Sequence, residues 1–253
     1  MERRIQFDND AGESLSGTLH LPESPVETGV VLSHCFTCSR HTSILRWICE
    51  ALTREGMAAL RFDFSGNGQS EGDFTDSNYS KMMDEIGSAT RRLEQEGVRW
   101  IGLLGHSLGA SVSVLYGADA DRIRAVCAIA GRLSGTMADR ILSPFQQQEM
   151  ERTGQVAFTS RGRDLTLTRS FFEDARRFDL PGALRRMHKP LLVVHGDRDE
   201  IVPVMEADRA GKEAAGTVTV EIVPGADHMF SDDAQRRKVT DMVVSWFLRQ
   251  SRS

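Results

Sequence analysis

The hydrophobic positions of this chain fall into short runs that alternate between two periods. Residues 29–34 form the first continuous apolar run, which is too short for a helix and typical of a strand buried on both faces. Residues 42–55 then carry apolar side chains at helical spacing, and Gly56 follows in the position of a C-terminal cap. The pattern predicts a buried strand followed by an amphipathic helix.

The same alternation continues along most of the chain, with short connections between the segments. Strand-like segments are 58–64, 100–104, 123–130, 191–195 and 218–223, and helical segments are 79–97, 108–118, 204–215 and 232–248. Strands that alternate with helices in this way form parallel β-α-β units. The sequence therefore predicts an α/β protein with a mostly parallel central sheet and helices on both of its faces.

Two stretches depart from the alternation. Residues 5–7 and 15–21 are alternating segments joined by an Asp/Asn/Gly-rich turn, which predicts an N-terminal antiparallel hairpin. Residues 132–188 contain Pro144, a run of three glutamines, a Leu-Thr alternation at 164–168 and a charged helical segment at 170–178. We interpret 132–188 as a small cap inserted into a single domain that spans 1–253.

Composition narrows the class of protein. A chain of 253 residues with 40% hydrophobic residues can bury a sizeable core, and its formal net charge of −5 with scattered basic residues argues against binding nucleic acid or anionic lipid. No stretch approaches the ~20 apolar residues of a membrane span, and the N-terminus turns acidic before any signal-like run appears. Four cysteines do not make a disulfide framework. We expect a soluble cytoplasmic protein that is not processed.

The first candidate for chemistry is a serine in a Gly-x-Ser-x-Gly motif. Gly105-His106-Ser107-Leu108-Gly109 follows a predicted buried strand and precedes a predicted helix. This is the context of a nucleophile elbow, in which a tight strand-to-helix turn exposes the serine hydroxyl above the sheet. We expect Ser107 to be a catalytic nucleophile.

A serine nucleophile needs a base and an acid that orients the base. Asp197, Asp199 and Glu200 lie just past the strand at 191–195, and His228 lies just past the next strand. The order Ser, acid, His along the chain is the order of the α/β-hydrolase fold and differs from that of chymotrypsin and subtilisin.

At these residues the chain resembles the α/β-hydrolase superfamily, and the resemblance runs from the first hairpin to the last helix. It implies that the acid is the second aspartate of the Gly-Asp-x-Asp loop, Asp199, and that Asp197 structures the loop by bonding nearby N–H groups. It also implies that His228 is the base. The alternative acid, Asp197, stays open at this point.

An ester carbonyl under attack develops an oxyanion, which two backbone N–H groups should stabilise. One N–H belongs to Leu108, the residue after the nucleophile. The segment His34-Cys35-Phe36-Thr37-Cys38 is similar to the His-Gly-Phe-Thr-Gly loop of the family, and this match assigns the second N–H to Phe36.

Cysteines replace both glycines of that loop. The Cys-x-x-Cys spacing alone suggests a redox pair or half of a zinc site, but the sequence has no second cysteine pair. We expect Cys35 and Cys38 to be small packed thiols. The same loop, together with Arg61–Gly72, resembles a bacterial hydrolase subgroup that is sometimes fused to an osmotically inducible peroxide-detoxifying domain.

The cap carries the information on substrate. Residues 132–188 contain ten arginines and seven acidic residues, so the cap is mildly basic and favours anionic groups, unless these charges simply form solvated faces. Residues 162–172 are similar to the small lid of cinnamoyl and feruloyl esterases. That resemblance implies a carboxylesterase that acts on aromatic acyl esters.

The sequence therefore predicts a serine hydrolase that cleaves a small-molecule ester through an acyl-enzyme at Ser107. The alternatives are a thioesterase or peptidase with the same triad, and a non-catalytic ligand-binding member of the fold. The chemistry implies no metal and no organic cofactor, and the sequence does not indicate an oligomeric state.

Overall fold

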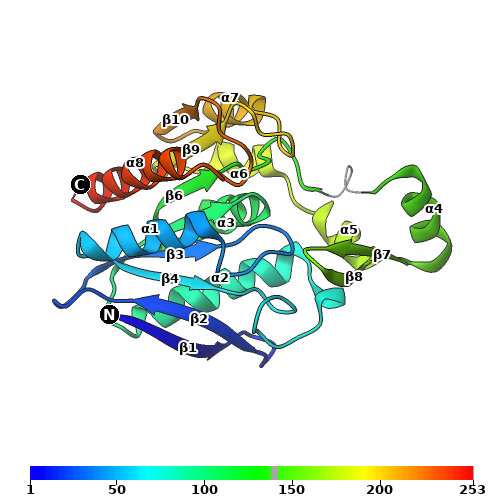
Figure 1. Cartoon of the computed structure of the whole chain (residues 1–253), viewed down its shortest axis with the longest axis horizontal. Coiled ribbons are helices and arrows are strands. Elements are labelled where there is room, and N and C mark those ends of the chain that lie inside the picture. The colour runs from blue at the N-terminus through cyan, green and yellow to red at the C-terminus, as the bar shows by residue number, and fades with distance from the viewer. Residues whose placement is uncertain (138–141, 253) are drawn as a thin grey trace.

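The computed structural model describes residues 1–137 and 142–252, and an eight-stranded sheet runs through the centre of the molecule (Figure 1). The strand order is β1-β2-β4-β3-β5-β6-β9-β10. Strands β1 and β2 form an antiparallel hairpin, β2 pairs antiparallel with β4, and the pairs from β4 to β10 are parallel. The strands are β1 (Glu2–Asp8), β2 (Ser14–His20), β3 (Thr28–Ser33), β4 (Ala58–Phe62), β5 (Trp100–His106), β6 (Ile123–Ile129), β9 (Leu191–Gly196) and β10 (Val218–Val223).

Helices cover both faces of the sheet. Helix α1 packs against α8 on one face, and α3 packs between α2 and α6 on the other, where α7 also lies against α6. The helices are α1 (Ser43–Arg54), α2 (Tyr79–Glu94), α3 (Leu108–Asp119), α6 (Leu180–Arg186), α7 (Met205–Glu213) and α8 (Asp233–Ser251). This arrangement confirms the predicted fold class, including the N-terminal hairpin.

The alternation of side chains along β3 explains why its sequence is apolar throughout. Val30 and Leu32 belong to the hydrophobic core under α1 and α8, whereas Val31 belongs to the core under α2 and α3. Successive side chains of a strand point to opposite faces, so a strand that is covered twice needs apolar residues at every position.

The cap lies beyond the carboxyl ends of the parallel strands (Figure 1). Its elements are α4 (Pro144–Thr153), the antiparallel hairpin of β7 (Gln155–Ser160) and β8 (Arg163–Thr168), and α5 (Arg169–Ala175). A short 3-10 helix, η1 (Phe74–Asp76), packs against β8. The cap boundaries 132–188 stay a sequence prediction, and residues 138–141 within them lie outside the described residues.

Helix α4 is one of the elements that the sequence pattern did not indicate, together with β7 and α6. Pro144 interrupts the periodic pattern of the sequence, but it occupies the first turn of α4, where its missing N–H removes no intrahelical hydrogen bond. Ser143 and Gln146 complete a capping box around this helix start. No helix among the described residues is long and apolar enough to cross a membrane.

Candidate active site

Ser107 lies at the turn between β5 and α3, and this tight turn requires an unusual backbone conformation of the serine. Its φ is 56° and its ψ is −116°, a strained combination for a residue with a side chain. A Cβ at Gly109 would lie 2.6 Å from the carbonyl oxygens of Ser33 and His34, and a Cβ at Gly105 would collide with the backbone of Gly109. The two glycines of the motif therefore allow β3, β5 and α3 to approach each other below the serine.

The structure brings Ser107, His228 and Asp199 into one hydrogen-bonded chain. The Oγ of Ser107 lies 3.0 Å from Nε2 of His228, and Nδ1 of His228 lies 2.7 Å from Oδ2 of Asp199. Since a carboxylate only accepts, Nδ1 carries the proton and Nε2 is left to accept the proton of the serine hydroxyl. The side chain of Asp199 is fully buried and that of His228 is 10% exposed.

A second imidazole, that of His195, contacts the same carboxylate. Its Nε2 lies 3.2 Å from Oδ2 of Asp199 and 2.9 Å from the carbonyl oxygen of Val202. Both partners are acceptors, so Nε2 of His195 carries the proton. The backbone N–H groups of Ile201 and Val202 donate to the other carboxylate oxygen at 2.9 and 2.7 Å.

These donors determine the ionisation of Asp199. Burial alone raises the pKa of this carboxyl, but the hydrogen bonds from His195, His228 and Val202 outweigh it and hold the pKa well below its ordinary value of 3.8. Asp199 is therefore an anion over the whole neutral and mildly acidic range.

The structure places the alternative acid, Asp197, away from the imidazole. Asp197 is exposed, and its Oδ1 accepts a hydrogen bond of 2.6 Å from the backbone N–H of Gly225. This contact ties the loop after β9 to the loop after β10, which carries His228.

His106, the residue before the serine, supports the loop that carries His228. Its Nε2 donates to the carbonyl oxygen of His228 at 2.9 Å, and its Nδ1 is buried without a partner among the described residues. Burial, and to a smaller extent the neighbouring His228, lower the pKa of His106 to about 4. His106 is therefore neutral at pH 7 and fixes the backbone of His228.

The loop after β3 carries Phe36, whose N–H the sequence match proposes as an oxyanion donor. His34 fixes the start of this loop, because its Nδ1 donates to the carbonyl oxygen of Cys35 at 2.7 Å and its Nε2 accepts from the N–H of Phe64 at 3.1 Å. No hydrogen-bond acceptor among the described residues contacts the N–H of Phe36 or of Leu108. Both N–H groups are therefore available to a ligand.

Cys35 and Cys38 form a disulfide, and our expectation of two packed thiols is wrong. Their Cα atoms are 5.2 Å apart, within the range that a disulfide spans. The left-handed residue of the loop is Thr37, with a φ of 59°, so neither cysteine adopts the positive φ that a glycine would favour. The tight turn that brings the two sulfur atoms together could not be inferred from residue spacing alone.

The side chain of Phe36 connects this loop to the cap. Its ring stacks on Phe158 of β7 at 5.9 Å between ring centroids and also contacts Phe74 and Phe171. The hydroxyl of Thr37 lies 2.8 Å from that of Ser160 at the end of β7. The cap hairpin thus contacts the loop that carries Phe36 and Thr37.

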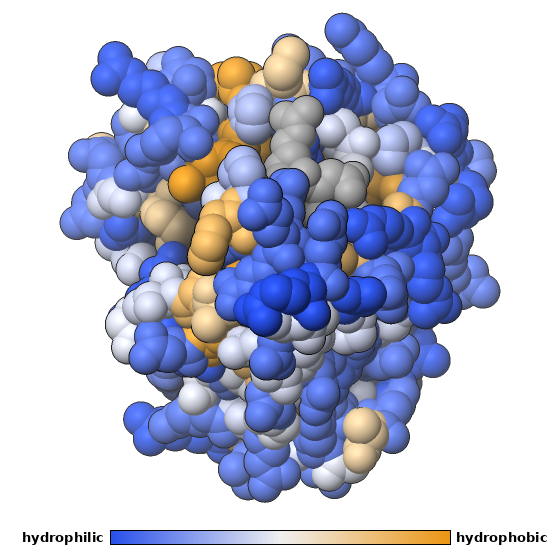
Figure 2. Space-filling model, turned by 90° about the vertical axis from the view of Figure 1, so that its right-hand side faces the viewer, coloured by the Kyte–Doolittle hydropathy of each residue, from blue (hydrophilic) through white to orange (hydrophobic). Residues whose placement is uncertain are grey.

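Two hollows meet at Ser107. One, of about 450 Å³, is lined by Phe36, Arg161, His228 and Met229 among others. The second, of about 400 Å³, is lined by Leu108, Arg132 and the segment 201–203. Met137 and Ile201 line both. Figure 2 views the cap end of the molecule and shows apolar surface gathered in a band between hydrophilic side chains. Ser107 lines both hollows and lies where they meet.

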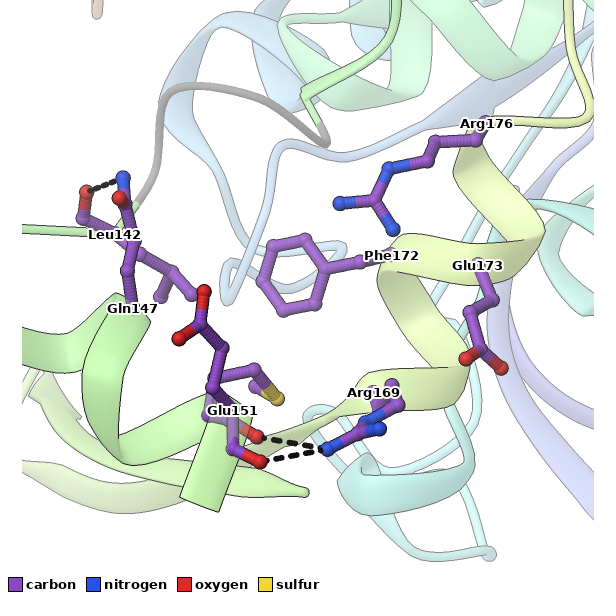
Figure 3. A pocket seen from close by; sticks show the side chains of 8 residues that line it. Leu142, Gln147, Glu151, Arg169, Phe172, Glu173 and Arg176 are labelled. Atoms are coloured by element: carbon purple, nitrogen blue, oxygen red, sulfur yellow. Dashed lines mark hydrogen bonds between the residues drawn. The ribbon is translucent and has the colours of Figure 1, made fainter. Parts of the chain in front are cut away.

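A further hollow of about 510 Å³ lies in the cap, between α4 and α5 (Figure 3). The ring of Phe172 points into it, and Arg169 donates to the carbonyl oxygens of Met150 and Glu151 at 3.2 and 3.1 Å. Neither Ser107 nor His228 lines this hollow. We therefore assign the chemistry to the two hollows at the serine.

No group of three or more His, Cys, Asp or Glu side chains among residues 1–137 and 142–252 is arranged to hold a metal ion.

A sheet of this order, with a nucleophile turn after β5, an acid loop after β9 and a histidine loop after β10, defines an α/β hydrolase. The chain belongs to the alpha/beta hydrolase family, whose sequence pattern matches residues 30–241.

The relatives of the chain include esterases and a thioesterase. It is 25% identical to a "putative phosphoribosyl transferase" of Mycobacterium tuberculosis over 92% of this chain and 43% of that protein, so the chain spans less than half of this relative. It is 28% identical to the "palmitoyl-protein thioesterase ABHD10, mitochondrial" of Pongo abelii over 74% of this chain and 61% of that protein.

Among solved structures, Est1E from Butyrivibrio proteoclasticus with bound ferulic acid superposes with a TM-score of 0.85. It is 23% identical, and the match covers 98% of this chain and 100% of that chain. This likeness shows the fold.

Sequence reasoning missed His195 and the cap residues that touch the loop of Phe36. His195 ends a buried strand, and its position four residues before Asp199 was the available signal. The contacts of Phe158 and Ser160 had no signal, because more than a hundred residues separate them from Phe36 and Thr37.

Proposed function

We propose that this chain is a serine carboxylesterase that works through an acyl-enzyme at Ser107. The observation that carries the proposal is the hydrogen-bonded chain of Ser107 Oγ, His228 Nε2 and Asp199 at the junction of two hollows. A turn serine in a protein that only binds a ligand needs no such base and no buried carboxylate behind it.

In the proposed first step, Ser107 Oγ attacks the ester carbonyl carbon while His228 Nε2 accepts the hydroxyl proton. The carbonyl oxygen becomes an oxyanion, and the N–H groups of Phe36 and Leu108 donate to it. The C–O bond to the alcohol then breaks, and His228 returns the proton to the departing alcohol. Asp199 stabilises the imidazolium that exists between these two proton transfers.

The second step repeats this chemistry with water. His228 takes a proton from water, the hydroxide attacks the acyl carbon, and the bond to Ser107 Oγ breaks with return of the proton to the serine. The products are a carboxylic acid and the free enzyme, and no cofactor enters the balance.

The two hollows support an ester with a bulky group on each side of the carbonyl. Apolar and aromatic side chains from Phe36, Met137, Ile201 and Met229 line the first hollow, which suits an aromatic acyl group. The ferulic acid in Est1E and the palmitoyl-protein activity in the name of ABHD10 make aromatic esters and acyl thioesters the two substrate classes to compare.

The test is a substrate panel measured with the wild type and with Ser107→Ala. The panel contains p-nitrophenyl esters of increasing chain length, methyl ferulate, and the N-acetylcysteamine thioesters of the same acids. We expect the highest kcat/KM on an aromatic ester and no turnover by Ser107→Ala. Turnover of thioesters alone would make the protein a thioesterase, and the absence of any turnover by wild type would favour the ligand-binding alternative.

A further inference from the structure

A basic hollow of about 500 Å³ lies beside the Ser107 site, and neither the mechanism nor the substrate panel uses it. Its lining consists of the loop 37–43, Gly68, Arg161, Arg163 and Met229. Arg161 occupies the turn of the cap hairpin and Arg163 begins β8. Thr37, Arg161 and Met229 also line the first hollow at Ser107, so the two spaces adjoin.

Among the described residues, no carboxylate forms an ion pair with either arginine. Arg163 donates from Nη2 to the carbonyl oxygen of Gly66 at 2.8 Å and from Nη1 to Oδ1 of Asn67 at 3.5 Å. Arg161 contacts the sulfur of Met229 at 3.7 Å. All of these partners are neutral, and none of the described residues that line the hollow is acidic. The described lining of this hollow therefore carries two positive charges and no acidic side chain, while Glu200 and Asp227 line the adjoining hollow at Ser107.

The nearest buried carboxylate is already paired. Asp63 forms an ion pair with Arg40 and accepts further hydrogen bonds from the N–H groups of Arg40 and Gln69. On the wall of the hollow, burial lowers the pKa of His41, and the charges of Arg40 and Arg61 lower it further. Asp63 raises this pKa and Arg46 lowers it, so more cationic than anionic side chains act on His41.

The wall formed by residues 39–43 adds hydrogen-bond donors. Helix α1 begins here without a side-chain cap, and the hydroxyl of Thr42 donates to the carbonyl oxygen of Ser39 at 2.9 Å. Ser43, the first residue of α1, lines the hollow and adds a hydroxyl to it. Two guanidinium groups with further donors match an anion that has several acceptor oxygens and two negative charges.

We propose that this hollow, defined by Arg161, Arg163 and the loop 37–43, binds a phosphate group of the substrate next to the ester that Ser107 attacks. This proposal rests on the proposed function, because it assumes that Ser107 cleaves an ester. It makes the preferred substrate an ester of a small phosphorylated alcohol or acid. Because the two hollows share three lining residues, the substrate that we propose carries its phosphate on a short linker to the ester.

The first test measures binding without turnover. Inorganic phosphate is titrated by calorimetry into the wild type, Arg163→Gln, Arg161→Gln and the control Arg152→Gln, which removes a cap arginine that does not line the hollow. We expect a Kd on the order of 1 mM for wild type and for Arg152→Gln, and at least a tenfold weaker Kd for the other two variants. Arg161 lies at an exposed turn, so we expect Arg161→Gln to fold. This variant tests the site even if Arg163→Gln does not fold.

The second test uses a matched pair of substrates, monobutyrylglycerol and monobutyrylglycerol 3-phosphate. Wild type should show about a tenfold lower KM for the phosphorylated ester, and Arg163→Gln should remove that difference. A monosuccinyl ester separates phosphate recognition from a general preference for anions.

The outcomes of the two tests are distinguishable. Phosphate binding by a wild type that hydrolyses neither these esters nor any ester of the first panel would overturn the proposed function and leave the phosphate site standing. Hydrolysis with equal KM for both esters and no phosphate binding would overturn the phosphate site alone. Equal preference for the succinyl and phosphorylated esters would overturn the assignment to phosphate.

Discussion

Asp199 accepts hydrogen bonds from two imidazoles and two backbone N–H groups, and its negative charge fixes the tautomer of His228. Asp199→Asn keeps the size of the side chain but presents an NH₂ group to Nδ1, so the imidazole turns its proton toward Ser107. We expect kcat to fall by about 10⁴-fold, as is typical when the orienting acid of a triad is neutralised. Steady-state kinetics on p-nitrophenyl acetate measures this.

Asp197→Asn is the matched control in the same loop. It removes a negative charge, keeps an amide oxygen that accepts from the N–H of Gly225, and leaves His228 untouched. We expect kcat/KM to change little. A larger loss with Asp197→Asn than with Asp199→Asn would show that the acid is assigned to the wrong residue.

The pH dependence of activity should contain a single ionisation on its acid side. Only a neutral His228 can accept the serine proton, so kcat/KM rises with pH as the imidazole loses its proton. The pKa of Asp199 lies well below its ordinary value, so Asp199 is already ionised and adds no second step. Log kcat/KM should rise with a slope of about one and then level off. A profile that stays flat from pH 5 to pH 8 would argue against His228 as the base.

The site residues differ in how they could be found from the sequence. Ser107 and His228 were predictable because a motif and chain order define them, and the choice of Asp199 over Asp197 came from resemblance. His195 was not predictable as a contact of Asp199, since only the turn of the loop after β9 brings it there. Arg161 and Arg163 were visible only as part of a basic cap, because a charge count does not show which charges face a hollow.

The loop after β3 is the element on which the proposed oxyanion site depends, and its disulfide is one of several restraints on it. The aromatic contacts of Phe36, the hydroxyl contact of Thr37 and the hydrogen bond from the N–H of Cys38 to the carbonyl oxygen of Cys35 hold the loop as well. The double variant Cys35→Ser/Cys38→Ser should therefore retain kcat/KM within tenfold of wild type.

The same variant should lose stability. A cross-link over so short a loop restrains the unfolded chain by about 2 kcal/mol, so the free energy of unfolding in urea should fall by about that amount. Wild type treated with dithiothreitol serves as the comparison. A large, reversible loss of activity on reduction that the double variant reproduces would show that the disulfide is required for the oxyanion site.

Element prediction worked where periodicity was strong, including β8 and α5 of the cap, and missed α4, β7 and α6. The parallel strands and their crossover helices were predictable because burial on both faces or on one stripe leaves a clear pattern. Helix α4 has Met150 as its buried residue, so it lacks an apolar stripe. Its start was nevertheless encoded in Ser143, Pro144 and Gln146, a capping signal that does not depend on periodicity.

The stability of the whole molecule should fall on acidification, because folding buries His106 in its neutral form. The unfolded chain binds a proton at this residue below its ordinary pKa of 6.5, whereas the folded protein binds it only below about 4. Between these values the unfolded state holds the extra proton, so the free energy of unfolding falls as the pH falls. The contribution at pH 5 is about 2 kcal/mol relative to pH 8.

Urea unfolding of wild type and His106→Gln at pH 5 and pH 8 measures this contribution, with the exposed His188→Gln as the control. The difference between the two pH values should shrink in His106→Gln and persist in His188→Gln. An equal pH dependence in all three proteins would show that His106 does not contribute to acid sensitivity.

The most direct test of the account asks whether Ser107 forms a covalent bond. Wild type is incubated with a fluorophosphonate, in which the serine oxygen displaces fluoride at phosphorus, and the adduct is located by intact-mass and peptide mass spectrometry. The account predicts one adduct per chain on the peptide that contains Ser107, and loss of esterase activity in proportion. Ser107→Ala should fold normally by circular dichroism, take no label and lose kcat by up to ~10⁶-fold. An unlabelled wild type, or a Ser107→Ala protein that hydrolyses esters within tenfold of wild type, would contradict it.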